Sequence, residues 1–342
     1  MGKKLITLLI VLMVVAASIF ANGENEEGAA GSSENIVIKL AHDNNVSTPA
    51  QEAFEEFKKV CSEKSDGRID VQIFPGGQLG SVQDTFEQAR RGDIQMSVAA
   101  TSLLTQTIPE FMVWDSYYMF DDAAHAHRVL DGKAGVELMK YLEPMNLYGL
   151  GYMEIGFRNF SNSRNPIVNP EDVEGLKIRG WSPMQIKAWE SVGCSLSNLS
   201  WSEVFTSLQQ HLIDGQECAT ASFYSAKFYE AQKYWSLTQH IYTNFLWYVN
   251  KDFMDNLSPE DQKIIRDAAK VAIDLDRELI VKAENETLDL LPGLGIEVNE
   301  VPLETRHILG EKMNNAIQDS IISKCGDSVY NLVMTEIENE RK

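Results

Sequence analysis

Apolar and polar residues alternate in Ile36–Ala41 and Ile69–Phe74, and this period of two predicts a pair of strands. The nearly all-apolar segment 94–99 predicts a third strand. Between the strands, apolar residues recur at helical spacing over 50–61, and a second helix is expected over 81–92, between the cap residue Ser81 and a glycine stop. This strand–helix order predicts parallel strands with helices covering the faces of the sheet.

The start of the first helix has the signature of a capping box. We expect Thr48 as the N-cap residue and Pro49 as the first helical residue. Gln51 stands three positions after Thr48, so we expect its side chain to close the box by bonding the Thr48 amide.

A second unit with the same strand–helix order begins near residue 148. Strands are predicted at 148–152, 177–179 and 216–219, and helices at 183–192 and 201–210. Residues 239–250 form a longer predicted strand, long enough to pass between two domains.

The longest apolar pattern at helical spacing covers residues 258–291. Ser258 and Pro259 form a strong helix start, and neither Gly nor Pro follows until Pro292. At 1.5 Å per residue this helix would be roughly 50 Å long, more than the diameter of one ~100-residue domain. We therefore expect one helix that runs along two domains. The alternative is two helices separated by a kink, which usually requires Pro, Gly or a π-bulge.

The N-terminal segment has the pattern of a secretory signal peptide. Two lysines precede the apolar run 5–17, and a small residue, Ala21, ends the segment. We expect residues 1–21 to be a signal peptide cleaved near Ala21, which would export the protein to the periplasm. The run is shorter than the ~20 residues that span a bilayer, and an uncleaved membrane anchor is the alternative. Residues 22–34 are rich in Gly, Ala, Ser and Glu, so a disordered N-terminus is expected.

Composition excludes some classes of partner. The 342-residue chain has a net charge of −20, which argues against nucleic acid and against an anionic membrane surface. A small anionic ligand is not excluded, because the local field matters more than the net charge. The length allows two domains.

No motif in the chain predicts an enzyme, a metal site or a cofactor. Residues 76–80 are glycine-rich but match neither GxGxxG nor the P-loop. His125 and His127 are two apart, so they do not share a helix face and a metal site there is not expected. An alternative remains open: Cys218, with His211 and Glu217, as the nucleophile of a thiol hydrolase.

The four cysteines are far apart in the sequence. They are Cys61, Cys194, Cys218 and Cys325, with no CxxC pair that would suggest a zinc ribbon or a thioredoxin-like motif. In an exported protein they would allow two disulfides of unknown pairing. The other interpretation, which we prefer, is that most are small buried thiols.

Basic residues cluster in one interval of this acidic chain. They are Arg158, Arg164, Lys177, Arg179 and Lys187. Arg179 ends a predicted strand, and open α/β sheets bind ligands outside the carboxyl ends of their strands. Its planar guanidinium can bind a carboxylate through two hydrogen bonds, with Arg158 as a second donor. The alternative is that both arginines form structural ion pairs with Asp or Glu.

Several short motifs occur together along the chain. They lie at 74–80 (FPGGQLG), 91–94 (RGDI), 154–158 (EIGFR), 175–179 (GLKIR), 201–205 (WSEVF), 214–217 (DGQE) and 227–230 (KFYE). In this set the chain resembles the substrate-binding proteins of tripartite ATP-independent periplasmic (TRAP) transporters, the dicarboxylate/sialic-acid-binding family. The resemblance covers nearly all of the chain from Ile36 onward.

The resemblance implies an α/β fold, that of a two-domain periplasmic binding protein (type II-like) with hinge strands and a long helix spanning both domains. Domain I is then expected to comprise 35–154 and 245–275, with a C-terminal helix at 326–342 packed on it. Domain II is expected to comprise 155–244 and 276–325. The ligand cleft would lie between them.

The resemblance also implies a set of ligand-binding residues. Arg179 would pair with the ligand carboxylate, Arg158 would support it, and Trp201 would pack on the ligand. Cys218 stands where the family commonly has asparagine, which leaves the ligand class open because a thiol is a weak donor. The other expected contacts are Trp181, Phe223 and Asn244, and from the first domain His42, Asn44, Asn45, Ala100 and Thr101. The alternatives are interdomain packing for Trp181 and ordinary caps for the first-domain residues.

We therefore expect an extracytoplasmic solute-binding protein that captures a small organic acid, namely a sugar acid, hydroxy acid or dicarboxylate. It would bind the carboxylate through arginine and deliver it to membrane-embedded TRAP permease subunits. We expect a monomer without cofactor, metal or nucleic acid. The alternatives are a sensor that presents its ligand to a signalling receptor and the thiol hydrolase using Cys218.

Overall fold

The computed structural model describes residues 35–341. The predicted signal peptide at 1–21 and the predicted disordered segment 22–34 lie outside these residues. Within the described part, no helix is both long enough and apolar enough to span a bilayer.

The described chain forms strands, α-helices and short 3₁₀ helices. The strands are β1 Ile36–Ala41, β2 Ile69–Phe74, β3 Met96–Ala100, β4 Leu147–Asn162, β5 Lys177–Gly180, β6 Ser195–Asn198, β7 Gly215–Ala219, β8 Tyr234–Asn250 and β9 Glu297–Glu300. The first α-helices are α2 Pro49–Lys64, α3 Val82–Arg91, α4 Thr101–Leu104, α5 Ala123–Asp131, α6 Lys133–Met139, α7 Pro183–Ser191 and α8 Trp201–Gln209. The later ones are α9 Thr220–Ser225, α10 Lys251–Asp255, α11 Pro259–Leu290, α12 Leu303–Cys325 and α13 Asp327–Glu340. The 3₁₀ helices are η1 Pro109–Asp115, η2 Lys140–Met145, η3 Pro170–Val173, η4 Phe228–Glu230 and η5 Leu291–Leu294.

All nine described strands belong to one mixed sheet, with the order β2-β1-β3-β8-β4-β7-β5-β6 and β9 beside β8. β1 pairs in parallel with β2 and with β3, as the strand–helix order predicts. β5 likewise pairs in parallel with β6 and β7. The α/β class is confirmed. The residue bounds of the two domains stay a prediction. The parallel strands β1–β3 and the parallel strands β5–β7 belong to one continuous sheet, so the sheet itself does not mark a boundary.

The centre of the sheet is an antiparallel pair of unusually long strands, β4 and β8, of 16 and 17 residues. The sequence predicts only 148–152 and 239–250 there. β4 continues to Asn162 through three shifts in its register with β8. They lie between Gly149 and Gly151, between Glu154 and Gly156, and between Arg158 and Phe160. Such bulges break the alternation of apolar and polar residues. Gly151 and Gly156 have φ of 146° and 86°, which glycine adopts without strain.

The start of α2 differs from the predicted capping box. Thr48 is the N-cap residue, but its side chain donates to the Asn45 carbonyl at 2.7 Å. The Gln51 side chain lies 2.9 Å from Nε2 of His42. The predicted capping box is wrong, because the Gln51 side chain that would have closed it bonds the buried imidazole of His42 instead.

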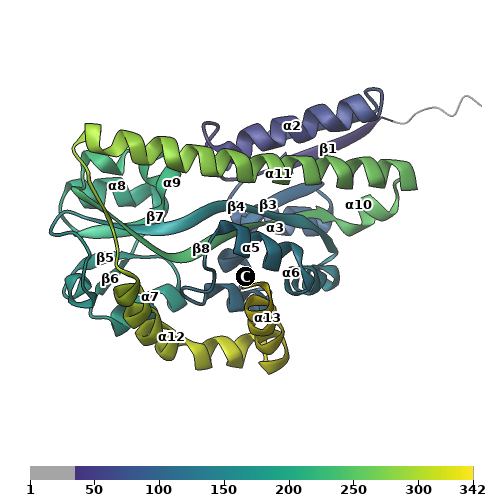
Figure 1. Cartoon of the computed structure of the whole chain (residues 1–342). Helices are drawn as coiled ribbons and strands as arrows, with labels where there is room; N and C mark the ends of the chain where they lie inside the picture. Colours follow the sequence, from purple (N-terminus) through teal and green to yellow (C-terminus); the bar gives the residue numbers. More distant parts are fainter. Residues whose placement is uncertain (1–34, 342) are drawn as a thin grey trace, which may run out of the picture. The chain divides into compact units, whose positions relative to one another are not determined.

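The long helix is confirmed as a single element. α11 has 32 residues without interruption, so the alternative of two separate helices is excluded. It packs against α2, β4 and α9, and Figure 1 shows it running beside α2. Its buried residues, among them Ile265, Ala268 and Ala272, recur at helical spacing. α11 therefore packs on elements from both ends of the sheet.

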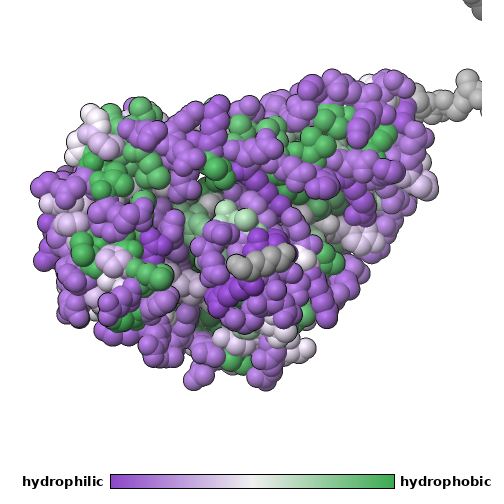
Figure 2. Space-filling view, in the orientation of Figure 1, coloured by the Kyte–Doolittle hydropathy of each residue, from purple (hydrophilic) through white to green (hydrophobic). Residues whose placement is uncertain are grey.

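The core consists of three clusters of buried apolar side chains. One joins α2, β1–β3 and the first half of α11. A second surrounds η1, α5, α6, α7 and α12. A third, smaller cluster lies around α8, α9 and Trp235. Figure 2 shows that the face in view is mainly hydrophilic, with separate hydrophobic areas, in keeping with the net charge of −20.

The cysteines are structural side chains within these clusters and their borders. Cys61, Cys194, Cys218 and Cys325 are all buried and unpaired. This agrees with the interpretation of buried thiols and not with that of two disulfides.

Candidate ligand-binding site

A cavity of about 420 Å³ lies where the carboxyl ends of β1, β3, β5 and β6 meet the central strands. Its walls come from loops after the strands, from the central strands β4 and β8 and from α9. The lining residues are Asp43, Asn44, Asn45, Thr48, Ala100, Ser102, Leu103, Ile155, Arg158, Arg179, Trp181, Asn198, Leu199, Ser200, Trp201, Cys218, Ser222, Ser225, Thr243 and Phe245. This location is typical of ligand sites in open α/β sheets.

Arg179 reaches this cavity from the end of β5 and is partly buried. Its Nε donates to the Leu199 carbonyl at 3.1 Å, and its guanidinium carbon lies 5.3 Å from the centre of the Trp201 ring. In residues 35–341 no carboxylate forms an ion pair with it. Burial and the nearby charge of Arg158 lower its pKa to about 10. Arg179 is therefore a cation at neutral pH whose burial is not balanced by a carboxylate.

Arg158, on β4, is different because it forms a buried ion pair. Its Nε donates to Oε2 of Glu217, and its Nη2 donates to the Glu217 carbonyl at 2.7 Å. Both residues are buried, with 9% and 1% of their surfaces exposed. The structural ion pair considered for both arginines is thus found for Arg158 and not for Arg179 in the described residues.

Glu217 is the centre of a wider network. Burial alone would raise its pKa, but Arg158 and the hydrogen bond and charge of His240 outweigh burial and lower the pKa to about 2. His240 Nε2 lies 3.0 Å from Oε2, and Trp181 Nε1 donates to Oε1 at 2.5 Å. The Trp181 ring also lies under Arg158, at 5.1 Å from the guanidinium carbon. Trp181 is therefore both a wall of the cavity and a support for Glu217.

The chain matches a family model described as "Bacterial extracellular solute-binding protein, family 7" over residues 40–324. The chain belongs to this family. The resemblance to TRAP substrate-binding proteins is confirmed.

Relatives of this solute-binding protein include the 2,3-diketo-L-gulonate-binding periplasmic protein YiaO of Escherichia coli. It is 34% identical over 271 residues, which cover 79% of this chain and 82% of YiaO.

Two solved structures show the same fold. One is a TRAP periplasmic solute-binding protein from Ochrobactrum anthropi, with TM-score 0.86, 33% identity, and coverage of 91% of this chain and 97% of that one. The other is the sugar acid binding protein DctPAm from Advenella mimigardefordensis in complex with galactonate. Its TM-score is 0.83 at 29% identity, with 90% and 99% of the two chains covered. These similarities support the two-domain, type II-like class.

Eight residues expected in the site of this solute-binding protein line the cavity. They are Arg179, Arg158, Cys218, Trp201, Trp181, Asn44, Asn45 and Ala100. The other four are not among its lining residues. His42 bonds Gln51, Phe223 stacks on Trp235 at 4.2 Å, and Thr101 donates to Asn244 at 3.0 Å. These four side chains contact other parts of the protein from segments that border the cavity.

Cys218 is buried in β7, and burial raises its thiol pKa to about 12. A neutral thiol is a poor nucleophile. His211 is exposed in the turn after α8, so sequence proximity does not make it a base for Cys218. The geometry of this solute-binding protein therefore disfavours the thiol hydrolase.

The histidine pair on α5 has no shared role. His125 packs on the C-terminal helix, with Nε2 at 3.0 Å from the Ile337 carbonyl. His127 Nε2 lies 2.5 Å from Glu154 and 3.0 Å from the Tyr242 hydroxyl. Across residues 35–341, no group of three or more His, Cys, Asp or Glu side chains is arranged to hold a metal ion.

Sequence reasoning missed several lining residues of this solute-binding protein. The charged one is Asp43, between the two expected residues His42 and Asn44. Others are the hydroxyl residues of α9, Ser222 and Ser225, which follow β7. Their position just after a strand is the signal that could have found them.

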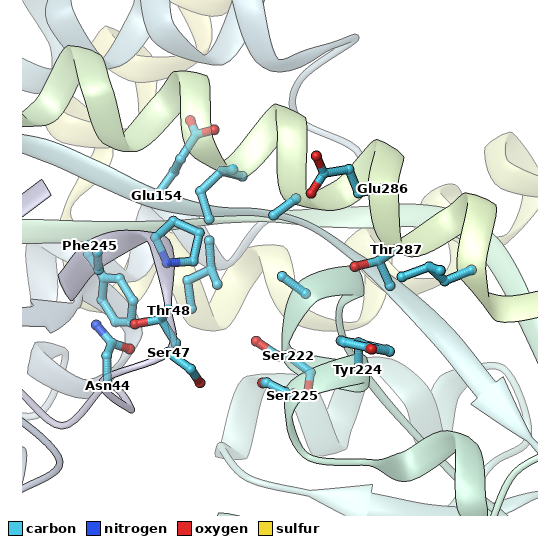
Figure 3. A pocket seen from close by; sticks show the side chains of 17 residues that line it. Asn44, Ser47, Thr48, Glu154, Ser222, Tyr224, Ser225, Phe245, Glu286 and Thr287 are labelled. Carbon is cyan, nitrogen blue, oxygen red and sulfur yellow. Dashed lines mark hydrogen bonds between the residues drawn. The ribbon is translucent and has the colours of Figure 1, made fainter. Parts of the chain in front are cut away.

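A second cavity of about 300 Å³ continues from the first below α11. It shares six lining residues with the first: Asn44, Thr48, Ile155, Ser222, Ser225 and Phe245. Figure 3 shows Asn44, Ser47 and Thr48 on one side, and Ser222, Tyr224 and Ser225 on the other, with Glu286 and Thr287 from α11. The cleft of this solute-binding protein therefore extends beyond the first cavity, which is lined by Arg158 and Arg179.

Proposed function

We propose that this protein captures a small organic acid in the cleft and delivers it to a TRAP-type permease. The single observation that carries the proposal is Arg179, a partly buried cation without a carboxylate partner in the described residues. Partial burial removes the Arg179 charge from water, which costs free energy. A bound anion would offset this cost.

The donors of Arg179 suit a carboxylate. Its Nε is occupied by the Leu199 carbonyl, and neither terminal nitrogen has a hydrogen-bond partner among the described residues. Two terminal nitrogens in one plane match the two oxygens of a carboxylate. Trp201 lies against the same guanidinium and offers an apolar face to the ligand. In this proposal Arg158, already paired with Glu217, supports the site more than it binds.

The chemistry of the relatives' ligands supports sugar acids. YiaO is named for 2,3-diketo-L-gulonate, and DctPAm was solved with galactonate. Each of these ligands carries a carboxylate on an oxygen-rich carbon chain. The cavity offers hydroxyl and amide groups for such a chain, among them Asn44, Thr48 and Ser222.

Capture requires that the two predicted domains close on the ligand. We propose 35–154 with 245–275 as one domain and 155–244 with 276–325 as the other. The bulged strands β4 and β8 and the helix α11 connect them, and register shifts near Glu154 are natural places to bend. Closure would exclude water from the ion pair and strengthen it.

Delivery implies export and a membrane partner. The predicted signal peptide supports a periplasmic location, and the family supports a TRAP permease as the partner. We propose a monomer that needs neither cofactor nor metal and that catalyses no reaction.

A thermal-shift screen followed by calorimetry tests the proposal. The panel contains aldonates, uronates, hydroxy acids, dicarboxylates and the neutral sugars that correspond to the acids. A ligand at a hundredfold excess over its Kd stabilises the native state by about 2.7 kcal/mol. We expect at least one acid to raise the melting temperature and its neutral counterpart to have no effect. Binding of neutral sugars only, or of no acid, would overturn the proposal.

A further inference from the structure

The cavity that contains Arg179 has three charged lining residues: Arg158, Arg179 and Asp43. The charge of Arg158 is balanced by Glu217, which is buried and ionised. The Arg158–Glu217 pair therefore adds almost no net charge to the cavity. What remains is one uncompensated cation, Arg179, and one anion, Asp43.

Asp43 and Arg179 come from strands that are well separated in the order of the sheet. It follows β1, whereas Arg179 ends β5, and β3, β8, β4 and β7 lie between these two strands. No cation pairs with Asp43 in residues 35–341. A ligand whose carboxylate pairs with Arg179 and whose other end reaches the β1 side of the cavity meets a wall that carries a carboxylate without a cation partner among the described residues.

The polar groups near Asp43 are suited to hydroxyl groups. Asn44, Asn45 and Thr48 follow it in sequence, and all three line the cavity. The Nδ2 of Asn44 is buried and has no hydrogen-bond partner within residues 35–341. Across from them, Ser222 and Ser225 contribute hydroxyl groups from α9, as Figure 3 shows. These groups donate and accept hydrogen bonds, and a hydroxyl group does both.

We infer that the cleft selects acids with a single carboxylate and a hydroxylated distal end, and that Asp43 excludes dicarboxylates of the same length. This inference rests on the proposed function and narrows it. A second carboxylate would meet the like charge of Asp43, without a second free cation among the lining residues to offset it. A hydroxyl at the same position would donate a hydrogen bond to Asp43.

The test compares acids that differ only at the distal carbon. Titration calorimetry is done with D-galactonate against galactarate and with D-threonate against D-tartrate. The acid that binds tightest in the panel is also compared with its matched monoacid or diacid. Each comparison uses the wild-type chain, Asp43→Asn and the control Asp70→Asn. Asp70 is exposed on β2 and is not among the cavity's lining residues, and its side chain accepts a hydrogen bond from Gln72.

In the wild type we expect the monocarboxylate to bind at least about tenfold tighter than its diacid, since opposing like charges is costly. Asp43→Asn should reduce this ratio by about tenfold, mainly through tighter binding of the diacid, while Asp70→Asn should leave it unchanged. The melting temperature of each variant checks that it is folded.

The outcomes separate this inference from the proposed function. A diacid that binds the wild type as tightly as its monoacid, or a ratio that Asp43→Asn does not change, overturns the inference and leaves acid capture standing. Absence of binding by every acid overturns both.

Discussion

Arg158 and Glu217 lie on neighbouring strands, and the arginine donates to both the side chain and the main chain of the glutamate. Arg179 lies near this pair but has no carboxylate partner in residues 35–341. Two arginines in one cavity thus have different electrostatic states. One helps to maintain the structure of the site, and the other is available to a ligand.

Removing the cation of Arg179 should weaken binding without harming the fold. Truncating one partner of a buried charge pair costs about 2–5 kcal/mol, or on the order of thirty- to several-thousand-fold in affinity. We expect that loss for Arg179→Ala in calorimetry with the acid found by the screen. The matched control is Arg164→Ala, an exposed arginine whose partner is Asp214. Unchanged affinity in Arg179→Ala would refute its role.

Glu217→Gln should destabilise the protein, because it leaves the Arg158 charge buried without compensation. Breaking a buried pair in this way costs about 3–5 kcal/mol. Denaturant unfolding of Glu217→Gln, Arg158→Met and the double variant measures the coupling between the two residues. We expect the double variant to be more stable than Glu217→Gln alone. Additive losses would contradict the pairing.

Stability should depend on pH through Asp276 on α11. Burial raises the pKa of Asp276 to about 8, with the charge of Glu154 adding to it and Arg277 opposing it. Its Oδ2 accepts a hydrogen bond from the Glu154 amide at 2.9 Å, while Oδ1 has no hydrogen-bond partner in the described part of the chain. In the unfolded chain the pKa is about 4. The folded state therefore holds this proton to higher pH, and the contribution of Asp276 to stability falls as pH rises from about 4 to 8.

Asp276→Asn keeps an acceptor for the Glu154 amide and removes the titration. We expect the variant to exceed the wild type in stability at pH 8–9, by a margin that shrinks toward pH 5. Unfolding curves across that range measure it. Parallel pH profiles for the two proteins would contradict the raised pKa.

The native protein should react slowly with a thiol reagent. Burial raises the pKa of Cys61, Cys194 and Cys218 to about 12 each, and that of Cys325 is also raised. We expect little fast reaction with Ellman's reagent before denaturation and four thiols after it, without added reductant. Fewer than four would indicate a disulfide. A fast native reaction lost in Cys218→Ser would revive the nucleophile hypothesis.

Elements with one clear period were predictable from the sequence. β1, β2 and α11 match their predicted ranges to within a residue, because each buries one regular face or stripe. β4 was predicted too short because its later half is buried on both faces and bulged, so no alternation remains. β6 was missed because Ser195–Asn198 contains one apolar residue and is held by pairing with β5.

The candidate site was predictable as a set of segments but not as side-chain directions. Arg179 could be placed because it ends a strand. The difference between Arg179 and Arg158 could not be predicted. Glu217 is far from Arg158 in the sequence, and the two residues become partners only through the pairing of their strands. His42 and Asp43 are adjacent, yet only Asp43 lines the cavity, since His42 is held by Gln51.

The continuity of α11 provides a way to follow the joint between the two proposed domains. Lys263 and Lys282 are both on this helix, with 74% and 68% of their side-chain surfaces exposed. Their backbone positions are about 28 Å apart along the axis at 1.5 Å per residue. Because these two residues belong to the two proposed domains, spin labels at these sites should report whether the helix bends when the ligand binds. Label pairs placed across the cleft would report domain closure directly.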